Sequence, residues 1–275
     1  MWATLTLMTA LSTAPAAAGD LQLTNPRLSY GQFGPTRKET KFLPGDVCFL
    51  TFDIEGLQFD EGGNAKWTMQ LDVIDPAGKS RGPNLEVPYE LFSLQGGGIV
   101  PYYAFADIPP DEKPGKYKMV VLITDQASKK EAKLEREYEV AEKGFGIVHL
   151  NCTYDFGDRN GPRYPAAGLG FVGQQLHLQF GVTGFDRDPK TKQPSIKLDV
   201  RMLDAEGKPT LKSPITETFP GKDQQFPEQL ALVPLNFPLA LTRPGKYTVE
   251  LTATDVLGKK TSTVSYPLVV QEPPK

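Results

Sequence analysis

One long segment of this chain occurs twice, and the repeat limits the fold more than any other feature. Residues 114–140 begin with Pro114-Gly115-Lys116-Tyr117, continue as an alternating segment that ends in Thr124-Asp125, and reach Val140 after a Lys-Lys pair. The same residue types recur in the same order over residues 244–270, which lie 130 positions further on. We therefore expect the chain to be a tandem of two copies of one β module.

Alternation of apolar and polar residues extends the repeat toward the start of each copy. A period of two is typical of a half-buried β-strand. In the first such strand the expected core-facing residues are Cys48, Leu50, Phe52 and Ile54, with Leu176, Leu178, Phe180 and Val182 at an offset of 128. In the next strand they are Trp67, Met69, Leu71 and Val73, with Ile196, Leu198, Val200 and Met202 at an offset of 129. No helical period of useful length occurs, so the sequence predicts an all-β fold.

The repeated segment also resembles a known class of module. Pro-Gly-x-Tyr, an alternating strand that ends in Thr-Asp, a Gly/Lys turn and a last strand are similar to the final strands of bacterial immunoglobulin-like modules of the polycystic-kidney-disease-like, cadherin-like and fibronectin-like kinds. This resemblance implies two tandem immunoglobulin-like β-sandwiches. It implies that Tyr117 and Tyr247 form tyrosine corners, each with its ring in the core and its hydroxyl bonded to backbone across the turn. It implies no particular activity, because such folds have many functions.

We expect four segments along the chain. Residues 1–18 resemble a signal peptide, since an apolar stretch precedes Ala16-Ala17-Ala18 and Gly19, although no Lys or Arg comes before it. Residues 19–142 and 143–272 are the two expected β-sandwiches, and residues 273–275 are a tail. The short linker within residues 139–146 favours a stiff, elongated pair. The predicted location is outside the cytoplasm: the periplasm, the cell surface or the medium.

Composition excludes some partners. The net charge is −3 and the pI is about 5.6, with acidic and basic residues interspersed. This balance provides no basic patch for nucleic acid or an anionic membrane. No stretch is long and apolar enough to be a stable transmembrane span. The expected partners are a protein or a cell-envelope polysaccharide.

Cysteines and histidines are few. Cys48 and Cys152 both fall on core-facing positions of different copies, so we expect free, buried thiols; an inter-module disulfide is the alternative, and it needs Cα atoms within about 7 Å. His149 and His177 fall on outward positions of their strands. They are expected to be exposed and without the companions that a zinc site or a catalytic triad needs.

Acidic loops are the weak candidates for a metal site. Hard cations such as Ca²⁺ take several oxygen ligands from a flexible loop. Oxygen donors of this kind are Asp155, Asp158, Asn160, Asp186 and Asp188. Asp and Asn in turns also bond their own backbone without a metal. The prediction is therefore no cofactor, with calcium as the alternative, and Asp125 and Asp255 are expected to cap turns.

Aromatic residues suggest a sugar-binding platform as a second function. Tyr102, Tyr103 and Phe105 follow a glycine triplet, and Tyr30, Phe33 and Phe42 form another group. At an offset of 130 the positions of Val100, Tyr102 and Phe105 are occupied by leucines, which favours a core role for part of the run. Tyr103 is the ring expected to be exposed.

No phosphate loop, nucleophile elbow, metal-ligand spacing or dinucleotide fingerprint occurs in the sequence. The leading hypothesis is a non-enzymatic exported protein for binding, adhesion or spacing, whose surface is formed by loops 56–66, 184–195 and 155–167 at one end of the modules. The alternatives are a carbohydrate-binding module or accessory subunit, and a hydrolase of unfamiliar type. Trp67 and Cys48 are expected to be structural core residues.

Overall fold

The computed structural model describes residues 19–82, 85–155 and 162–273. These residues form 17 strands in four sheets and no helix, so the predicted all-β class is confirmed. The expected signal peptide at 1–18 and most of the tail lie outside the described residues, as do Asp158 and Asn160.

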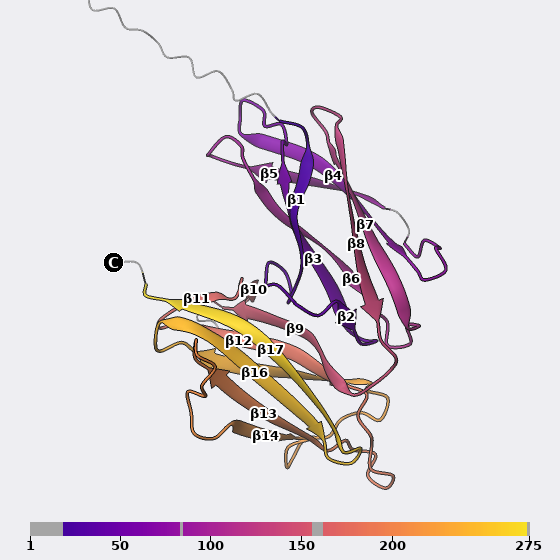
Figure 1. Ribbon diagram of the computed structural model, residues 1–275, viewed down its shortest axis with the longest axis vertical. Coiled ribbons are helices and arrows are strands. Elements are labelled where there is room, and N and C mark those ends of the chain that lie inside the picture. Colours follow the sequence, from indigo (N-terminus) through magenta and orange to yellow (C-terminus); the bar gives the residue numbers. More distant parts are fainter. Residues whose placement is uncertain (1–18, 83–84, 156–161, 274–275) are drawn as a thin grey trace, which may run out of the picture.

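The first sheet pair uses the first eight strands (Figure 1). Its narrow sheet has the order β1-β3-β6 and its wide sheet has the order β2-β8-β7-β4-β5. The strands are β1 (Gln22–Ser29), β2 (Lys41–Phe42), β3 (Val47–Glu55), β4 (Asn64–Ile74), β5 (Glu86–Phe92), β6 (Val100–Asp107), β7 (Gly115–Asp125) and β8 (Glu131–Val140).

The second sheet pair repeats this plan in the remaining strands. One sheet has the order β10-β9-β12-β15 and the other has the order β11-β17-β16-β13-β14. The strands are β9 (Gly146–Tyr154), β10 (Tyr164–Pro165), β11 (Leu169–Phe171), β12 (Gln175–Thr183), β13 (Ile196–Leu203), β14 (Ile215–Phe219), β15 (Leu232–Ala240), β16 (Gly245–Asp255) and β17 (Lys260–Gln271).

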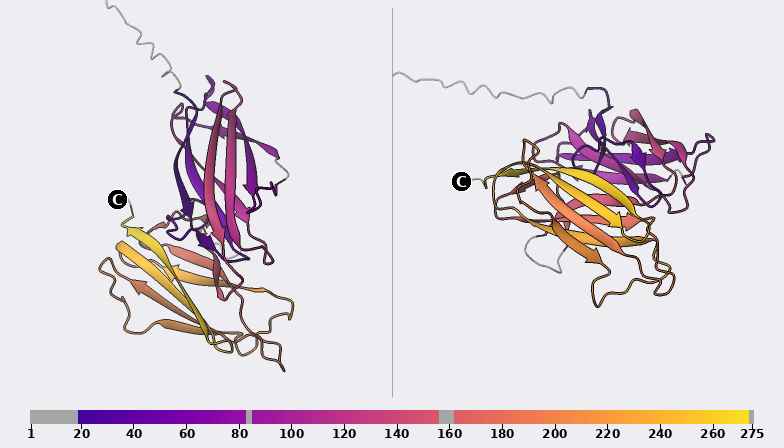
Figure 2. Two further views of the ribbon diagram at one scale, coloured as in Figure 1. Left: turned by 45° about the vertical axis from the view of Figure 1, so that its right-hand side comes forward. Right: turned by 60° about the horizontal axis from the view of Figure 1, so that its bottom comes forward.

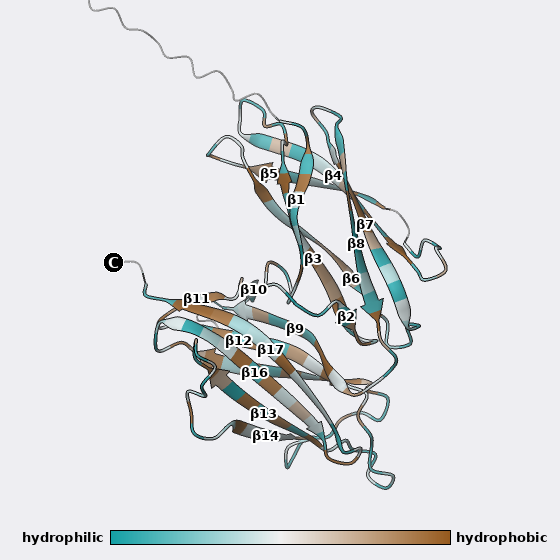
Figure 3. Cartoon of the chain, in the orientation of Figure 1, coloured by the Kyte–Doolittle hydropathy of each residue, from teal (hydrophilic) through white to brown (hydrophobic). Residues whose placement is uncertain are grey.

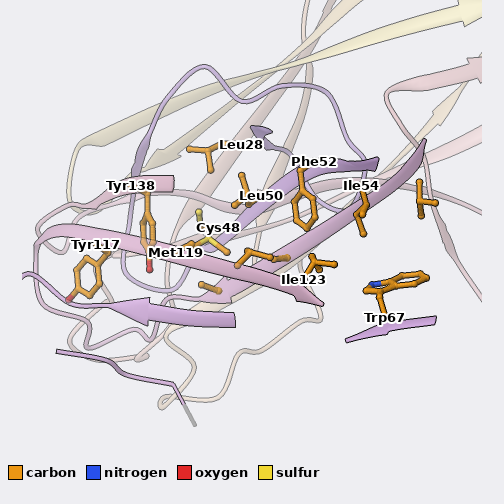
Figure 4. Close-up of a cluster of buried hydrophobic side chains, with 14 of the residues drawn as sticks. Leu28, Cys48, Leu50, Phe52, Ile54, Trp67, Tyr117, Met119, Ile123 and Tyr138 are labelled. Atoms are coloured by element: carbon orange, nitrogen blue, oxygen red, sulfur yellow. The ribbon is translucent and has the colours of Figure 1, made fainter. Parts of the chain in front are cut away.

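The core of the first sheet pair lies where period-two alternation predicts it. Cys48, Leu50, Phe52 and Ile54 of β3 are completely buried and meet Met119 and other residues of β7 (Figure 4). Burial of apolar surface stabilises a fold by roughly 25 cal/mol per Å². The outward positions of β8 carry charged residues, and Figure 3 shows teal segments along β8.

The repeated Pro-Gly-Lys-Tyr motif begins β7 and β16. Gly115 and Gly245 have φ angles of 148° and 151°, which favour glycine because a Cβ would collide with its surroundings. A Cβ on Gly115 would lie 2.6 Å from Cγ of Pro76. The Tyr117 hydroxyl lies 2.9 Å from the carbonyl oxygen of Lys113. The Tyr247 hydroxyl donates to backbone carbonyls at 3.2 and 3.3 Å, so both tyrosines have the geometry that the resemblance implies.

The carboxylates that end β7 and β16 cap the turns that follow. Asp125 and Asp255 are fully buried. Each accepts hydrogen bonds from two backbone N–H groups of its own turn. Because these bonds satisfy the buried carboxylates, the turn-capping interpretation accounts for both residues.

The repeat continues through β6 and β15, but at a different offset from the expected one. Cys48 lies opposite Ala106, and its counterpart Leu176 lies opposite Leu239. The offset is therefore 133, not 130, and Tyr102 corresponds to Leu235. The predicted matches of Val100 and Phe105 with leucines were wrong, since Val100 corresponds to Val233 and Phe105 to Pro238. The reason is that the loop before β15 is three residues longer.

The two sheet pairs contact one another directly (Figure 2). Asp46, which precedes β3 and is 2% exposed, accepts a hydrogen bond of 2.8 Å from the backbone nitrogen of His149 in β9. The same carboxylate pairs with Arg37 at 2.8 Å. Tyr30 follows β1, yet its ring belongs to the second core, 5.8 Å from the ring of Tyr266. The division at residues 142 and 143 stays a prediction, because the chain before it contributes to the second core.

Candidate functional site

The sheets of the first pair differ in width, and the difference leaves one side open. β5 pairs with β4 in the wide sheet, so it does not extend the narrow sheet beyond β6. In a constant-type immunoglobulin sandwich the two sheets have four and three strands, and the fourth strand lies beside the fifth. Here β5 and β6 are instead the edges of two different sheets. The inner face of the wide sheet consequently projects past β6.

Core-side side chains are exposed along this projection. The residues of β5 that face the core side are the partners of Trp67 and Met69, namely Tyr89 and Val87. Val87 is 40% exposed, and Leu85 just before β5 is 65% exposed. Met69 and Leu71 of β4 are only half-buried, although both point toward the core. A sandwich sheet normally buries this face, so the exposed side chains identify an unfilled position.

These residues line a groove with a volume of about 260 Å³, which we call the first edge slot. Its floor is formed by Met69, Leu71, Leu85, Val87 and Tyr89, and its wall by Tyr102, Tyr103, Ala104 and Phe105. The rings of Tyr103 and Phe105 are nearly parallel, with an interplanar angle of 21° and centroids 6.4 Å apart. Phe49 lies opposite Phe105 on β3 and stacks on it at 5.7 Å. Phe49 and Phe105 alternate with the buried core residues of β3 and β6, so this stack lies on the outer face of the narrow sheet, beside the slot.

The electrostatics of the first edge slot are neutral. Its only titratable lining groups are the hydroxyls of three tyrosines. Burial, together with a hydrogen bond to Tyr89, raises the pKa of Tyr102 far above its ordinary value. Tyr102 therefore stays a neutral phenol near pH 7 and supplies no base.

The second sheet pair has a matching groove of about 380 Å³ between β14 and β15, which we call the second edge slot. Its residues include Val200, Met202, Ile215 and Phe237. Ile215 is 45% exposed, as its counterpart Leu85 is exposed in the first copy. The repeat therefore includes the open side of each sheet pair as well as its core.

Neither slot was predicted from the sequence. The signal was present, because Leu85, Val87, Tyr89 and Leu91 alternate with Glu86, Pro88 and Glu90. Alternation predicts a strand with one apolar face, but it does not reveal which sheet the strand joins. The expected binding surface, made of loops at one end, was also wrong for the second sheet pair. β9 runs antiparallel to β12, so Asp155, which follows β9, lies at the opposite end of β12 from loop 184–195.

His177 was expected to be exposed, and this expectation was wrong. Its position on β12 is outward, but the residue is only 6% exposed. Its Nε2 lies 3.1 Å from Oδ2 of Asp155, and its Nδ1 lies 3.4 Å from Nδ2 of Asn236 on β15. Asn236 in turn accepts a bond of 3.2 Å from Arg163. The period-two pattern gave the correct face, and the neighbouring polar side chains cover it. His149 is exposed, as expected.

The described acidic candidates do not converge. Asp155 bonds His177 at one end of the sheet. Asp186 pairs with Lys260 at 2.9 Å beyond the other end of β12. Asp188 accepts hydrogen bonds from the N–H groups of Lys190 and Thr191 in its own turn, which hold the pKa of this carboxyl below its ordinary value. Over residues 19–82, 85–155 and 162–273 no three His, Cys, Asp or Glu side chains form a cluster able to hold a metal ion.

The two cysteines are free and buried, which confirms that expectation. Burial raises the pKa of each thiol to about 12. Of the aromatic candidates, Phe105 is 46% exposed while Tyr103 is half-buried, so Phe105 and not Tyr103 is the more exposed ring. Tyr30 and Phe42 are buried in the two cores, which removes them from any platform.

Comparisons with known proteins leave the function open. No protein-family model matches the chain, and no curated protein matches it. Among solved structures, the crystal structure of red sea bream transglutaminase is similar with 10% identity and a TM-score of 0.27. That match covers 93% of this chain and 32% of the transglutaminase chain, so this chain spans about a third of that protein. No helix in the described parts of the chain has the length and hydropathy of a membrane span.

Proposed function

We propose that this chain is a non-enzymatic binding protein that holds its ligand in the first edge slot. We also propose that residues 1–18 direct export of the protein. Its partner is then a protein or polysaccharide of the cell envelope or of the surroundings. Adhesion and spacing are roles that such a binding protein would serve.

The observation that supports this proposal is the exposure of core-side apolar side chains beside packed aromatic rings. Val87 and Leu85 are 40% and 65% exposed, and Phe105 is 46% exposed. Complete burial of such a side chain stabilises a complex by about 1.5–3 kcal/mol. Contiguous apolar surface of this kind marks binding sites on folded proteins. A ligand that covers the slot therefore gains affinity from surface that the fold itself leaves open.

The lining favours binding over catalysis. Acid–base chemistry needs a group whose pKa lies near the working pH. The slot offers tyrosines only, and burial raises the pKa of Tyr102 far from that range. This neutrality supports a binding role.

The first edge slot can be tested with the fluorescence of a single tryptophan. Trp2 lies within residues 1–18, so a chain of residues 19–275 retains only Trp67. The Trp67 ring lies 5.8 Å from the ring of Tyr89 and 5.5 Å from that of Tyr102, directly beneath the slot. The apolar dye 1-anilinonaphthalene-8-sulfonate should bind there and quench Trp67 by energy transfer.

Two variants complete this test. Val87→Glu places a charge in the first edge slot and should reduce the quenching severalfold. Ile215→Ser alters the second edge slot and should leave the quenching unchanged. Equal quenching in the parent chain and in Val87→Glu would contradict the proposed site.

A carbohydrate-binding module is the second candidate, and one observation favours it. The rings of Tyr103 and Phe105 are within 21° of parallel, as stacking on consecutive sugar rings requires. A glycan array probed with the parent chain and with Phe105→Ala would test this reading. Binding of defined glycans that is lost in Phe105→Ala would favour a carbohydrate ligand.

A further inference from the structure

We infer that the first edge slot receives one extended strand of another polypeptide, which pairs with the open edge of β6 and inserts alternate apolar side chains. This inference rests on the proposed function and names its class of partner. β-Strand addition to an exposed sheet edge is a general mode of peptide recognition.

The arrangement of strands leaves room for one strand beside β6. Within the described chain, β6 pairs with β3 on one side and has no strand on its other side. β4 pairs with β5, which carries the wide sheet further out. Neighbouring strands lie about 4.8 Å apart, so a strand added to β6 would lie above the inner face of β5. It would cover Val87 and Leu85, which are 40% and 65% exposed.

The chemistry of β6 suits an added strand. Its sequence from Val100 to Ala106 contains no charged residue, and Pro101 is its only residue without a backbone N–H. The remaining edge groups would make ladder hydrogen bonds with a partner strand. The partner's side chains alternate between the two faces, and those on the inner face would meet Met69, Leu71 and Val87. The predicted ligand is therefore a segment with an apolar residue at every second position.

The second copy carries two substitutions that protect its edge. The counterpart of Val87 is Glu217, which faces the core side of β14 opposite Leu198. The counterpart of Phe105 is Pro238 on β15, in addition to Pro234, which matches Pro101. Inward-pointing charges and prolines are devices by which natural proteins prevent strand addition. The first copy lacks both at these positions, so the two slots differ in the feature that strand addition requires.

Other occupants fit the first edge slot less well. A sugar needs several hydrogen-bonding groups around its ring, whereas the slot lining offers only tyrosine hydroxyls among apolar side chains. A second copy of this chain could pair its own β6 with this β6, but its own wide sheet would then lie next to the slot. Because that sheet also projects past β6, the two β5 strands would compete for the same space. A single extended strand avoids this conflict.

A library experiment tests the inference directly. Residues 19–275 would be used to select from a phage-displayed library of random octapeptides, and enriched peptides would be synthesised. We expect enriched sequences with apolar residues at alternate positions, and we expect them to quench or shift Trp67 fluorescence. Methylation of alternate backbone nitrogens in such a peptide should abolish binding, because it removes the ladder hydrogen bonds. A methylated peptide that binds as well as its parent would overturn the inference.

Two variants that copy residues of the second repeat test the inference, and a third variant is the matched control. Val87→Glu and Phe105→Pro should each weaken peptide binding about tenfold, since burying an unpaired charge, or leaving a ladder acceptor without its donor, costs at least roughly the 1.4 kcal/mol of a tenfold change. Glu86→Gln, on the opposite face of β5, should bind like the parent. Val87→Glu alone is sufficient if Phe105→Pro does not fold.

The outcomes separate this inference from the proposed function. Dye binding in the first edge slot without any enrichment of alternating peptides would overturn strand addition and leave the binding function standing. Peptide binding that is insensitive to both variants would also overturn it. Loss of dye quenching and of peptide enrichment together would overturn both.

Discussion

Individual residues of the repeated motif have the same place in both copies but different surroundings. Tyr117 is 3% exposed, and its hydroxyl lies 2.7 Å from Oε1 of Glu112 as well as 2.9 Å from the Lys113 carbonyl. Glu112 is itself buried and pairs with Arg81. The hydroxyl of Tyr247 makes longer bonds, and its donor Arg243 is exposed. The first tyrosine corner is therefore part of a buried polar network.

This difference predicts unequal effects of two matched substitutions. Tyr117→Phe should lower the free energy of unfolding by about 1–3 kcal/mol, because it removes a buried bond to a carboxylate. Tyr247→Phe should lower it by only about 0.5–1 kcal/mol, because its bonds to the backbone carbonyls are longer and its bond from Arg243 is exposed to solvent. Urea unfolding followed by circular dichroism measures both values. Equal losses would contradict the role of Glu112.

The two thiols give a prediction about reactivity. Burial raises the pKa of Cys48 and of Cys152 from 9.0 to about 12, so both stay protonated at pH 8. A folded chain should not react with Ellman's reagent at that pH. A chain unfolded in guanidinium without reductant should release two equivalents of thionitrobenzoate, one for each thiol. Rapid reaction of the folded chain would contradict the burial of the thiols.

The same pKa shifts fix the sign of an alkaline effect. Well below the ordinary value of 9.0 the thiols are protonated in both the folded and the unfolded chain, so they cause no pH dependence there. Between about pH 9 and about pH 12 the unfolded thiols ionise while the folded ones do not. Stability should fall across this window, and a Cys48→Ala, Cys152→Ala chain should show a shallower fall.

Individual strands show what could be predicted from the sequence and what could not. β3, β7, β12 and β16 lie where their alternation placed them, because a strand with one apolar face must turn that face to a core. Alternation did not determine that β5 would join β4, because pairing depends on the partner strand and not on the strand's own pattern. It likewise gave the face of His177 but not the cover formed by Asp155 and Asn236. The offset of β15 was missed because a longer loop precedes it.

Because one side of the wide sheet is open, substitutions in two of its strands should differ strongly in their effect on the free energy of unfolding. Ile123 of β7 is fully buried, whereas Val87 of β5 is 40% exposed on the same core-facing side. Ile123→Ala should lower the free energy of unfolding by about 2–5 kcal/mol. Val87→Glu should change it by only about 0.5 kcal/mol, like a surface substitution. A large loss in Val87→Glu, measured by urea unfolding, would mean that Val87 already contributes to the core.

The whole molecule is held together by a joint between the two sheet pairs. Asp46 is its central group, because its Oδ1 accepts from the N–H groups of Val47 in the first pair and His149 in the second, both at 2.8 Å. His149 has a φ angle of 58°, a left-handed conformation that is uncommon for a residue with a side chain. Gly31 also approaches the second pair closely, since a Cβ there would lie 2.6 Å from Cβ of Asn151. These contacts link the two pairs through backbone as well as side chains.

Removal of this carboxylate should loosen the joint without unfolding either sheet pair. Asp46→Ala leaves the N–H group of His149 and Nη1 of Arg37 without their acceptor, and an unsatisfied buried donor costs about 1–3 kcal/mol. We expect faster amide exchange at His149 and a larger radius of gyration in small-angle X-ray scattering. Asp53→Ala is the matched control, because Asp53 lies on β3 and bonds only within the first pair, to Asn25. The radius of gyration and the His149 amide exchange of Asp46→Ala could instead match those of Asp53→Ala. In that case the joint is maintained by the packing of Tyr30 against Tyr266. The stiffness of the molecule then comes from apolar contact and not from the buried carboxylate.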